Sequence, residues 1–98
     1  MRDSYKEIEG KLKSLTPFNG NTMRGEFDER GNFKVYSYST VIAVFWKLAE
    51  GRELDTQWYS ETTSKHQRLV ARAWGFSPLK PKKDRAAAGS YAYAGVMA

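Results

Sequence analysis

The chain has 98 residues, of which 41% are hydrophobic and 14% aromatic, and its formal net charge is +5; this is enough apolar material for one small folded domain and excludes global disorder. The absence of cysteine excludes disulfides, zinc–thiolate sites and thiol catalysis, and it fits a reducing cytosol. The N-terminus is charged and no apolar run approaches the roughly 20 residues of a membrane helix, so we expect neither a signal peptide nor a membrane partner.

Residues 4–15 are predicted to form an amphipathic helix. Ser4 and Glu7 have the spacing of a capping box, and Pro17 disfavours helical backbone at the residue before it. One face of this helix would carry the apolar residues Tyr5, Ile8, Leu12 and Leu15.

From residue 22 the hydrophobic period changes from that of a helix to the period of two that is typical of strands. Turn-forming residues separate the segments by connections too short for a parallel crossover, so the strands should pair as an antiparallel meander within residues 22–60. A break or bulge is expected at Ser39-Thr40. The predicted strands are Thr22–Asp28, Phe33–Tyr38, Val41–Lys47 and Leu54–Tyr59.

A second helix is predicted at about residues 64–75. Ser64 and Gln67 fit a capping box, Gly75 suits a left-handed C-cap, and Pro78 follows. Its apolar stripe would consist of Leu69, Val70, Ala73 and Trp74.

The predicted fold class is therefore α+β. An antiparallel meander of three or four strands is packed by this short C-terminal helix and by the additional N-terminal amphipathic helix. Residues 1–79 would form the single domain, and residues 80–98 would be a basic and then Ala/Gly/Tyr-rich tail. An alternative is that the end of the tail docks on the domain as an added strand.

The excess positive charge lies entirely in the last part of the chain. Residues 1–60 carry nine basic and nine acidic residues, whereas residues 61–98 carry seven basic and two acidic residues, giving +5. Such asymmetry indicates an anionic partner, typically nucleic acid or an acidic protein surface. A solvated surface that keeps the protein soluble accounts for it equally well.

The start of the second predicted helix is unusually basic. Free N–H groups, nearby hydroxyls and Lys65 would suit a phosphate, although cations that simply face water are the simpler interpretation. The basic tail would add salt-sensitive attraction to phosphate backbones, but its composition is also that of an inert linker. The candidate nucleic-acid or phosphate contacts are Ser64, Lys65, Arg68, Arg72, Lys80, Lys82, Lys83 and Arg85.

Tyr36 and Tyr38 are candidates for stacking on nucleic-acid bases, because single-strand binders combine aromatic and basic side chains on one surface. The alternative is that both tyrosines support the N-terminal helix with their hydroxyls in water. The three tryptophans, Trp46, Trp58 and Trp74, are most simply core residues.

Catalysis is not expected. His66 is the single histidine, and Ser64, two residues away, does not share its helix face. No second histidine or cysteine completes a metal site, and phosphate loops, nucleophile elbows and zinc-protease motifs are absent from the sequence. We therefore expect a non-enzyme without metal or cofactor, in which His66 is buried and hydrogen-bonded.

Two segments, Tyr36-Ser-Tyr-Ser-Thr-Val-Ile-Ala43 and Tyr59-Ser-Glu-Thr-Thr-Ser-Lys-His-Gln67, resemble a recurring small domain of bacteriophage and archaeal-virus proteins that carries a "YSxTTSKHQ" motif. The resemblance covers residues 33–75 or so. It implies a virus-encoded accessory protein in a host cytoplasm, and it implies no reaction, partner or site residue.

The function expected from the sequence is that of a small, non-catalytic accessory protein that binds nucleic acid through the basic helix and tail. One alternative is a protein-binding inhibitor of a host enzyme or defence complex, because small size and many aromatic residues suit a protein interface as well. Another is a minor component of the virion. Binding that weakens steeply with salt would favour the first function.

Overall fold

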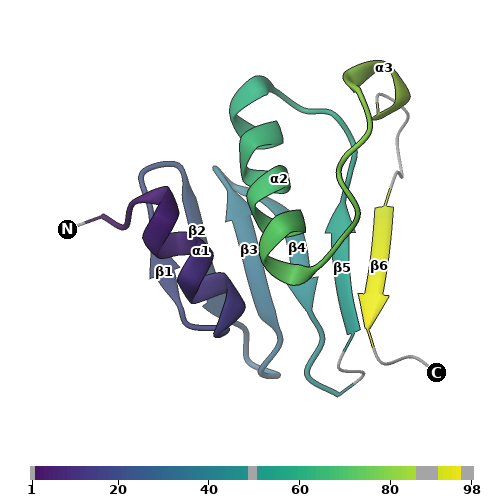
Figure 1. The fold of residues 1–98 in the computed structure, drawn as a ribbon. Helices are drawn as coiled ribbons and strands as arrows, with labels where there is room; N and C mark the ends of the chain where they lie inside the picture. Colours follow the sequence, from purple (N-terminus) through teal and green to yellow (C-terminus); the bar gives the residue numbers. More distant parts are fainter. Residues whose placement is uncertain (1, 49–50, 86–90, 96–98) are drawn as a thin grey trace.

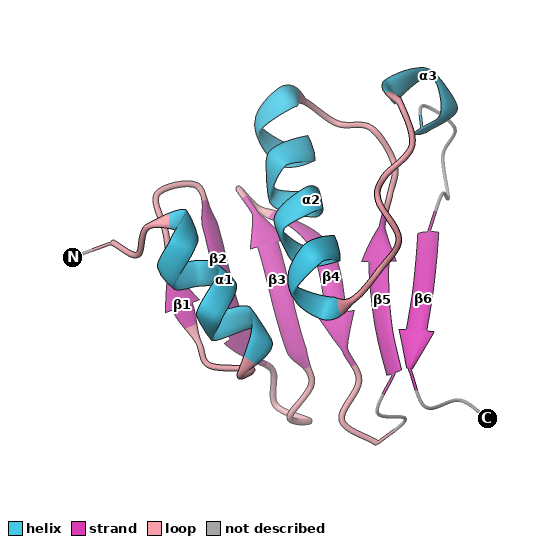
Figure 2. Cartoon of the chain, viewed as in Figure 1, coloured by secondary structure: helices cyan, strands magenta, loops and turns pink. Residues whose placement is uncertain are grey.

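A computed structural model describes residues 2–48, 51–85 and 91–95. Six strands form one sheet in chain order, and all neighbouring strands are antiparallel. Helices α1 (Tyr5–Lys13) and α2 (Glu61–Trp74) lie together on one face of this sheet (Figures 1 and 2). The strands are β1 (Phe18–Asn19), β2 (Met23–Phe27), β3 (Phe33–Ser37), β4 (Thr40–Phe45), β5 (Gly51–Asp55) and β6 (Tyr91–Gly95), and the short helix α3 (Lys82–Arg85) precedes β6.

The structure confirms the α+β class and the antiparallel meander between two helices, but the sheet has more strands than the three or four predicted. β1 has only two residues, too few to show a period of two. β5 begins at Gly51 and ends at Asp55, four residues before the predicted end at Tyr59, because the chain then turns away to begin α2.

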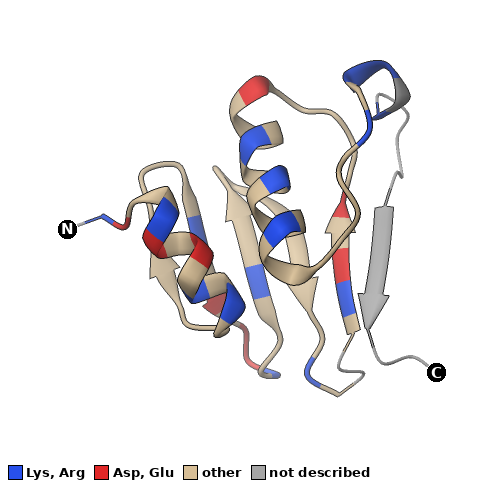
Figure 3. Ribbon diagram, in the orientation of Figure 1, with Lys and Arg blue, Asp and Glu red and all other residues tan. Residues whose placement is uncertain are grey.

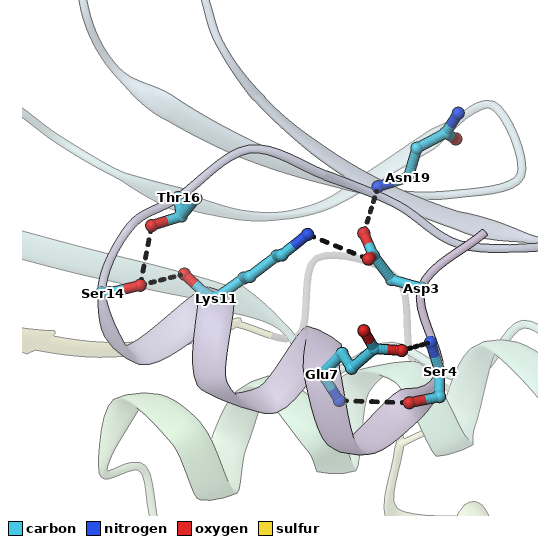
Figure 4. A network of polar contacts seen from close by, with 7 residues as sticks. All are labelled: Asp3, Ser4, Glu7, Lys11, Ser14, Thr16 and Asn19. Carbon is cyan, nitrogen blue, oxygen red and sulfur yellow. Dashed lines mark hydrogen bonds and ion pairs between the residues drawn. The ribbon is translucent and has the colours of Figure 1, made fainter. Parts of the chain in front are cut away.

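The capping box of α1 is confirmed and fastens the N-terminal segment. Ser4 Oγ accepts a hydrogen bond from the Glu7 N–H at 3.3 Å, and Glu7 Oε1 accepts one from the Ser4 N–H at 3.0 Å (Figure 4). Asp3 then ties the segment to β1, since its carboxylate accepts from the Asn19 N–H at 3.1 Å and pairs with Lys11 at 2.9 Å. These contacts fix α1 over β1 and β2.

The turn between β3 and β4 lies one residue earlier in the chain than predicted. Tyr38 and Ser39 are its two turn residues, because β3 ends at Ser37 and β4 begins at Thr40, its partner in the ladder. The irregularity expected at Ser39-Thr40 occurs later: Val35 pairs with Ala43 and Tyr36 with Val41, which leaves Ile42 as an extra residue on β4.

The core lies between the helices and the sheet, around Phe33. This ring packs against Phe18, Phe27 and Trp74 at centroid distances of 5.0–6.5 Å. The prediction that Trp46 is a core residue is wrong, because Trp46 follows the last residue of β4 and is 39% exposed. The buried apolar cluster comprises Ile8, Leu12, Phe18, Met23, Phe33, Val35, Ile42, Ala43, Leu54, Leu69, Val70, Ala71 and Trp74.

α2 begins one turn earlier than predicted. Its N-cap is Ser60, whose side chain accepts from the Thr63 N–H at 3.1 Å, and its first residue is Glu61. Ser64, the predicted N-cap, is inside the helix and fully buried. The predicted C-terminus is confirmed, since Gly75 has φ +79° in the left-handed region.

The boundary predicted between residues 79 and 80 is not the end of the fold. Arg85 in α3 is 1% exposed, and β6 pairs with β5 from Tyr91 to Gly95. The alternative of an added strand is therefore the correct one for residues 91–95. The rest of the predicted tail beyond α3, residues 86–90 and 96–98, lies outside the described part of the chain.

Two glycines provide opposite tests of this packing. A Cβ at Gly25 would lie 2.8 Å from Phe33 Cζ and closer still to the Phe18 ring, whereas a Cβ at Gly10 in α1 would meet no atom within 4 Å. Gly25→Ala should therefore lower the free energy of unfolding by about 1–3 kcal/mol. Gly10→Ala should raise it by about 0.5–1 kcal/mol, because alanine restricts the unfolded chain. Urea unfolding measures both; equal effects would contradict the packing around Phe33.

Candidate functional site

The motif Thr62-Thr-Ser-Lys-His-Gln67 in α2 divides its side chains between the core and the solvent. Thr63, Ser64, His66 and Gln67 are 0–4% exposed, whereas Lys65 is exposed. Polar residues thus occupy helix positions that face the sheet. Buried polar side chains are costly unless they are hydrogen-bonded, so the partners of these four residues decide what the motif does.

His66 is surrounded by hydroxyl groups. Its Nδ1 lies 2.6 Å from Ser37 Oγ, and its Nε2 lies 3.2 Å from both Tyr5 Oη and Thr22 Oγ1. Ser37 Oγ in turn lies 2.9 Å from Thr63 Oγ1. Hydroxyls both donate and accept, so they satisfy either neutral tautomer of the ring.

Burial lowers the pKa of His66 below its ordinary value of 6.5. The side chain therefore stays neutral near pH 7 and joins α1, the β1–β2 turn and β3 to α2. The prediction of a buried, hydrogen-bonded histidine is confirmed.

A second buried network forms around the guanidinium group of Arg85. Its Nε donates to the Thr56 carbonyl at 2.8 Å, and its two terminal nitrogens donate to Ser64 Oγ at 3.0 Å and Gln67 Oε1 at 2.5 Å. Gln67 Nε2 donates onward to the carbonyls of Asp55 at 2.6 Å and Gln57 at 2.9 Å. The network holds α3 and the chain after β5 against α2.

Two of the eight predicted phosphate contacts belong to this buried network and not to the surface. Ser64 and Arg85 are 0% and 1% exposed and hydrogen-bond to each other, so a phosphate outside the protein does not reach them. The proposed cradle at the start of the helix also shifts, because the first residue of α2 is the acidic Glu61 and the helix N–H groups there are capped by Ser60.

The six other predicted contacts are exposed and lie in two segments, α2 and residues 80–83. Lys65 and Arg68 lie on one exposed side of α2, and neither forms an ion pair with a carboxylate of the described residues. Figure 3 shows basic residues along α2 and again on the segment that leads into α3. We call Lys65, Arg68, Lys80, Lys82 and Lys83 the basic face; all five are exposed.

Contacts around Trp58 hold α3 against the chain between β5 and α2. Lys82 Nζ lies 4.9 Å from the centroid of the Trp58 ring, and the Arg85 guanidinium carbon lies 5.7 Å from it. Burial lowers the pKa of Arg85, the positive charge of Arg68 lowers it further, and the carboxylate of Asp55 acts in the opposite direction. Exposed positive charges on neighbouring segments attract an anion.

Arg72 is on the same side of α2 but is already occupied. Its Nε and one terminal nitrogen donate to the two carboxylate oxygens of Glu9 at 3.0 and 2.9 Å, which joins α2 to α1. This bidentate pairing lowers the pKa of Glu9 and raises that of Arg72. We therefore place Arg72 at the edge of the basic face and outside its definition.

Neither candidate stacking tyrosine is among the residues of the basic face, and the ring centroid of Tyr38 lies 6.4 Å from that of His66 in α2. Tyr36 belongs to the sheet face opposite the helices, where the Arg24 guanidinium carbon lies 4.1 Å above its ring centroid. Tyr38 is 54% exposed in the β3–β4 turn. The alternative that Tyr36 supports α1 is wrong, because its neighbours in the strand, Val35 and Ser37, are the residues turned toward the helices.

The described ranges of the chain contain no group of three or more His, Asp or Glu residues that could hold a metal ion. No helix among them is long and apolar enough to cross a bilayer. That the protein is not an enzyme stays a prediction.

Arg85→Ala tests whether this arginine is structural. The substitution removes three hydrogen bonds from a charged group and leaves buried acceptors unpaired, so the free energy of unfolding should fall by about 3 kcal/mol. Lys83→Ala, two residues away and exposed, should change it by less than about 0.5 kcal/mol. Denaturant titration of both variants measures the difference, and equal small effects would contradict a structural role for Arg85.

His66 should also make stability depend on pH. Its pKa is lowered in the folded state, so below about pH 6.5 the unfolded chain binds a proton that the folded protein resists, and the free energy of unfolding falls as pH falls. The four carboxyls with lowered pKa values, Asp3, Glu7, Glu9 and Asp28, act only below their ordinary values of 3.8–4.5. Unfolding measured from pH 5 to 7.5 should lose most of this slope in His66→Gln; an unchanged slope would contradict the assignment.

Comparison with known proteins identifies a family but no activity. No curated protein and no solved structure matches the chain. One family model matches residues 1–85, which includes both helices of the main layer, strands β1–β5 and the buried Arg85. The chain therefore belongs to the family described as a family of unknown function, DUF8033.

Proposed function

We propose that the protein is a non-catalytic accessory protein that binds the phosphate backbone of nucleic acid through the basic face. The observation that carries this proposal is the exposure of Lys65 and Arg68, which form no ion pair with a described carboxylate, together with the exposure of Lys80, Lys82 and Lys83. Backbone phosphates bind such surfaces electrostatically and without reading sequence.

The division of labour within α2 supports the same function. Its inward polar residues are consumed by hydrogen bonds to the protein, whereas Lys65 and Arg68 form no hydrogen bond or ion pair that anchors them to described residues. Long cationic side chains that stabilise little in the fold are available for a ligand. The hydrogen bonds of Arg85 to Ser64 and Gln67 hold α3 near α2, and Trp58 packs against Lys82 and Arg85.

The origin and location of the protein form part of the proposal. The resemblance of residues 36–43 and 59–67 to a domain of bacteriophage and archaeal-virus proteins supports a virus-encoded protein that acts in the host cytoplasm. The absence of cysteine agrees with a reducing compartment.

A second candidate function, binding and inhibition of a host protein, has an observation in its favour. Three large apolar side chains are exposed where β2 and β4 end: Phe27 is 47%, Trp46 39% and Leu48 95% exposed. β2 and β4 both end beside the start of β3, so these residues share one end of the sheet. Exposed apolar groups of this kind are typical of protein contacts.

The proposal predicts strong dependence of nucleic-acid binding on the basic face and on salt. If all five cations contact duplex phosphates, the logarithm of the affinity should fall with the logarithm of salt concentration with a slope of roughly −4.5. Lys65→Glu combined with Arg68→Glu should abolish binding at moderate salt without unfolding, because both side chains are exposed. Fluorescence anisotropy with labelled DNA and RNA, single-stranded and duplex, measures both effects.

A charge-matched control separates a site from bulk charge. Arg30→Glu combined with Lys47→Glu changes the net charge equally, and both residues lie at the end of the sheet near the β2–β3 turn. This variant should retain most of the binding. Equal losses in the two double variants would contradict a localised site, and no binding of any of the four nucleic acids at low salt would replace this proposal with the protein-binding one.

A further inference from the structure

A cleft of about 210 Å³ lies at the end of the sheet where β1 turns into β2. The N-terminal segment contributes Arg2 to its lining, β2 contributes Arg24, and the two neighbouring turns contribute residues 19–22 and Tyr38. None of the described lining residues is acidic, and two are arginines; one of them, Arg24, forms an ion pair with Glu26 at 3.0 Å and lies over the ring of Tyr36. It shares no residue with the basic face.

Both arginines have guanidinium N–H groups that donate no hydrogen bond to the described residues. One terminal nitrogen of Arg2 donates to the Gly20 carbonyl at 2.9 Å, and Nε of Arg24 pairs with Glu26 at 3.0 Å. Their other guanidinium nitrogens donate to no atom of the described residues. The nearby carboxylate of Asp3 is engaged by Lys11 and by the Asn19 N–H (Figure 4), which fixes the backbone that carries Arg2 beside β1.

The β1–β2 turn adds neutral donors to these charges. The Gly20 N–H closes the turn by donating to the Met23 carbonyl at 2.7 Å, whereas the N–H groups of Asn21 and Thr22 donate to no described atom. Free backbone N–H groups in a turn beside two guanidinium groups favour an oxyanion with several acceptor oxygens, such as a phosphate.

Tyr38 forms an aromatic side of the cleft, although its backbone conformation is unfavourable for a residue other than glycine. Its φ is +57°, in the left-handed region where glycine is favoured, and its side chain is nevertheless 54% exposed. Its N–H donates to the Thr22 carbonyl at 2.7 Å, which fastens the two turns together across the cleft. An exposed phenol ring beside a cationic cleft suits a planar ligand group.

We propose that this cleft binds a nucleoside phosphate, with the phosphate between Arg2 and Arg24 and the base on the ring of Tyr38. The volume agrees with this division: an open cleft of about 210 Å³, below the roughly 300 Å³ at which ligand pockets usually begin, has room for the phosphate and leaves the base at the rim. The same chemistry is offered by a free nucleotide and by the phosphorylated 5′ end of a strand.

Isothermal titration of the full chain with adenosine 5′-monophosphate, inorganic phosphate and adenosine tests the proposal. The monophosphate should bind at least about tenfold more tightly than either part, because stacking and charge-assisted contacts act together. Arg24→Ala and Tyr38→Gly should each weaken it by about tenfold. Glycine accepts a positive φ, so Tyr38→Gly should keep or raise the thermal midpoint, which separates lost binding from lost folding.

The matched control is Arg30→Ala, an exposed arginine that does not line the cleft, and it should bind as the unchanged protein does. A tetranucleotide with and without a 5′-phosphate distinguishes the two sources: preference for the phosphorylated form assigns the strand end, and binding of the mononucleotide alone assigns the free nucleotide. Lys65→Glu with Arg68→Glu should leave mononucleotide binding intact. Absence of binding by both phosphorylated probes at millimolar concentration, or unchanged affinity in Arg24→Ala and Tyr38→Gly, would overturn the proposal.

Discussion

The fold depends on polar side chains of α2 that are buried against the sheet and fully hydrogen-bonded. His66 reaches α1, the β1–β2 turn and β3 through hydroxyl groups, and Gln67 reaches the chain after β5 through two backbone carbonyls. Such groups stabilise little in net terms while paired and cost several times more when a partner is lost. These hydrogen bonds therefore fix the position of α2 on the sheet more precisely than apolar contacts alone would.

This arrangement explains why one short motif contains both a structural and a surface role. Helical geometry turns Thr63, His66 and Gln67 inward and leaves Lys65 and Arg68 outward on the same two turns. Arg85 extends the network of buried polar residues. By hydrogen-bonding to Ser64 and Gln67, it brings the segment that carries the lysines of residues 80–83 toward α2. A cation buried for structure thus positions the cations that remain in solvent.

Much of the fold could be predicted from the sequence, whereas which polar residues of α2 and α3 are buried and which are exposed could not. The capping box at Ser4, the alternation in β3 and the stop at Gly75 are local signals, and all three are confirmed. The start of α2 was misplaced because Ser60 and Ser64 both satisfy cap chemistry, and only burial distinguishes them. A signal did exist: residues 63, 66, 67, 70 and 74 share one helical stripe that continues the apolar face. Nothing local marks Arg85 as buried, since its partners are about 20 residues away or more.

The central claim is that His66 is a neutral, enclosed joint between α2 and the rest of the domain. Because the chain has a single histidine, a two-bond proton–nitrogen NMR spectrum of the imidazole reports this residue without ambiguity. Recorded from pH 5.5 to 8 on the full chain, the spectrum should show a neutral ring whose titration midpoint lies below the ordinary pKa of 6.5. A ring that titrates at 6.5 or above would contradict the account, because it would place His66 in contact with solvent or with a carboxylate.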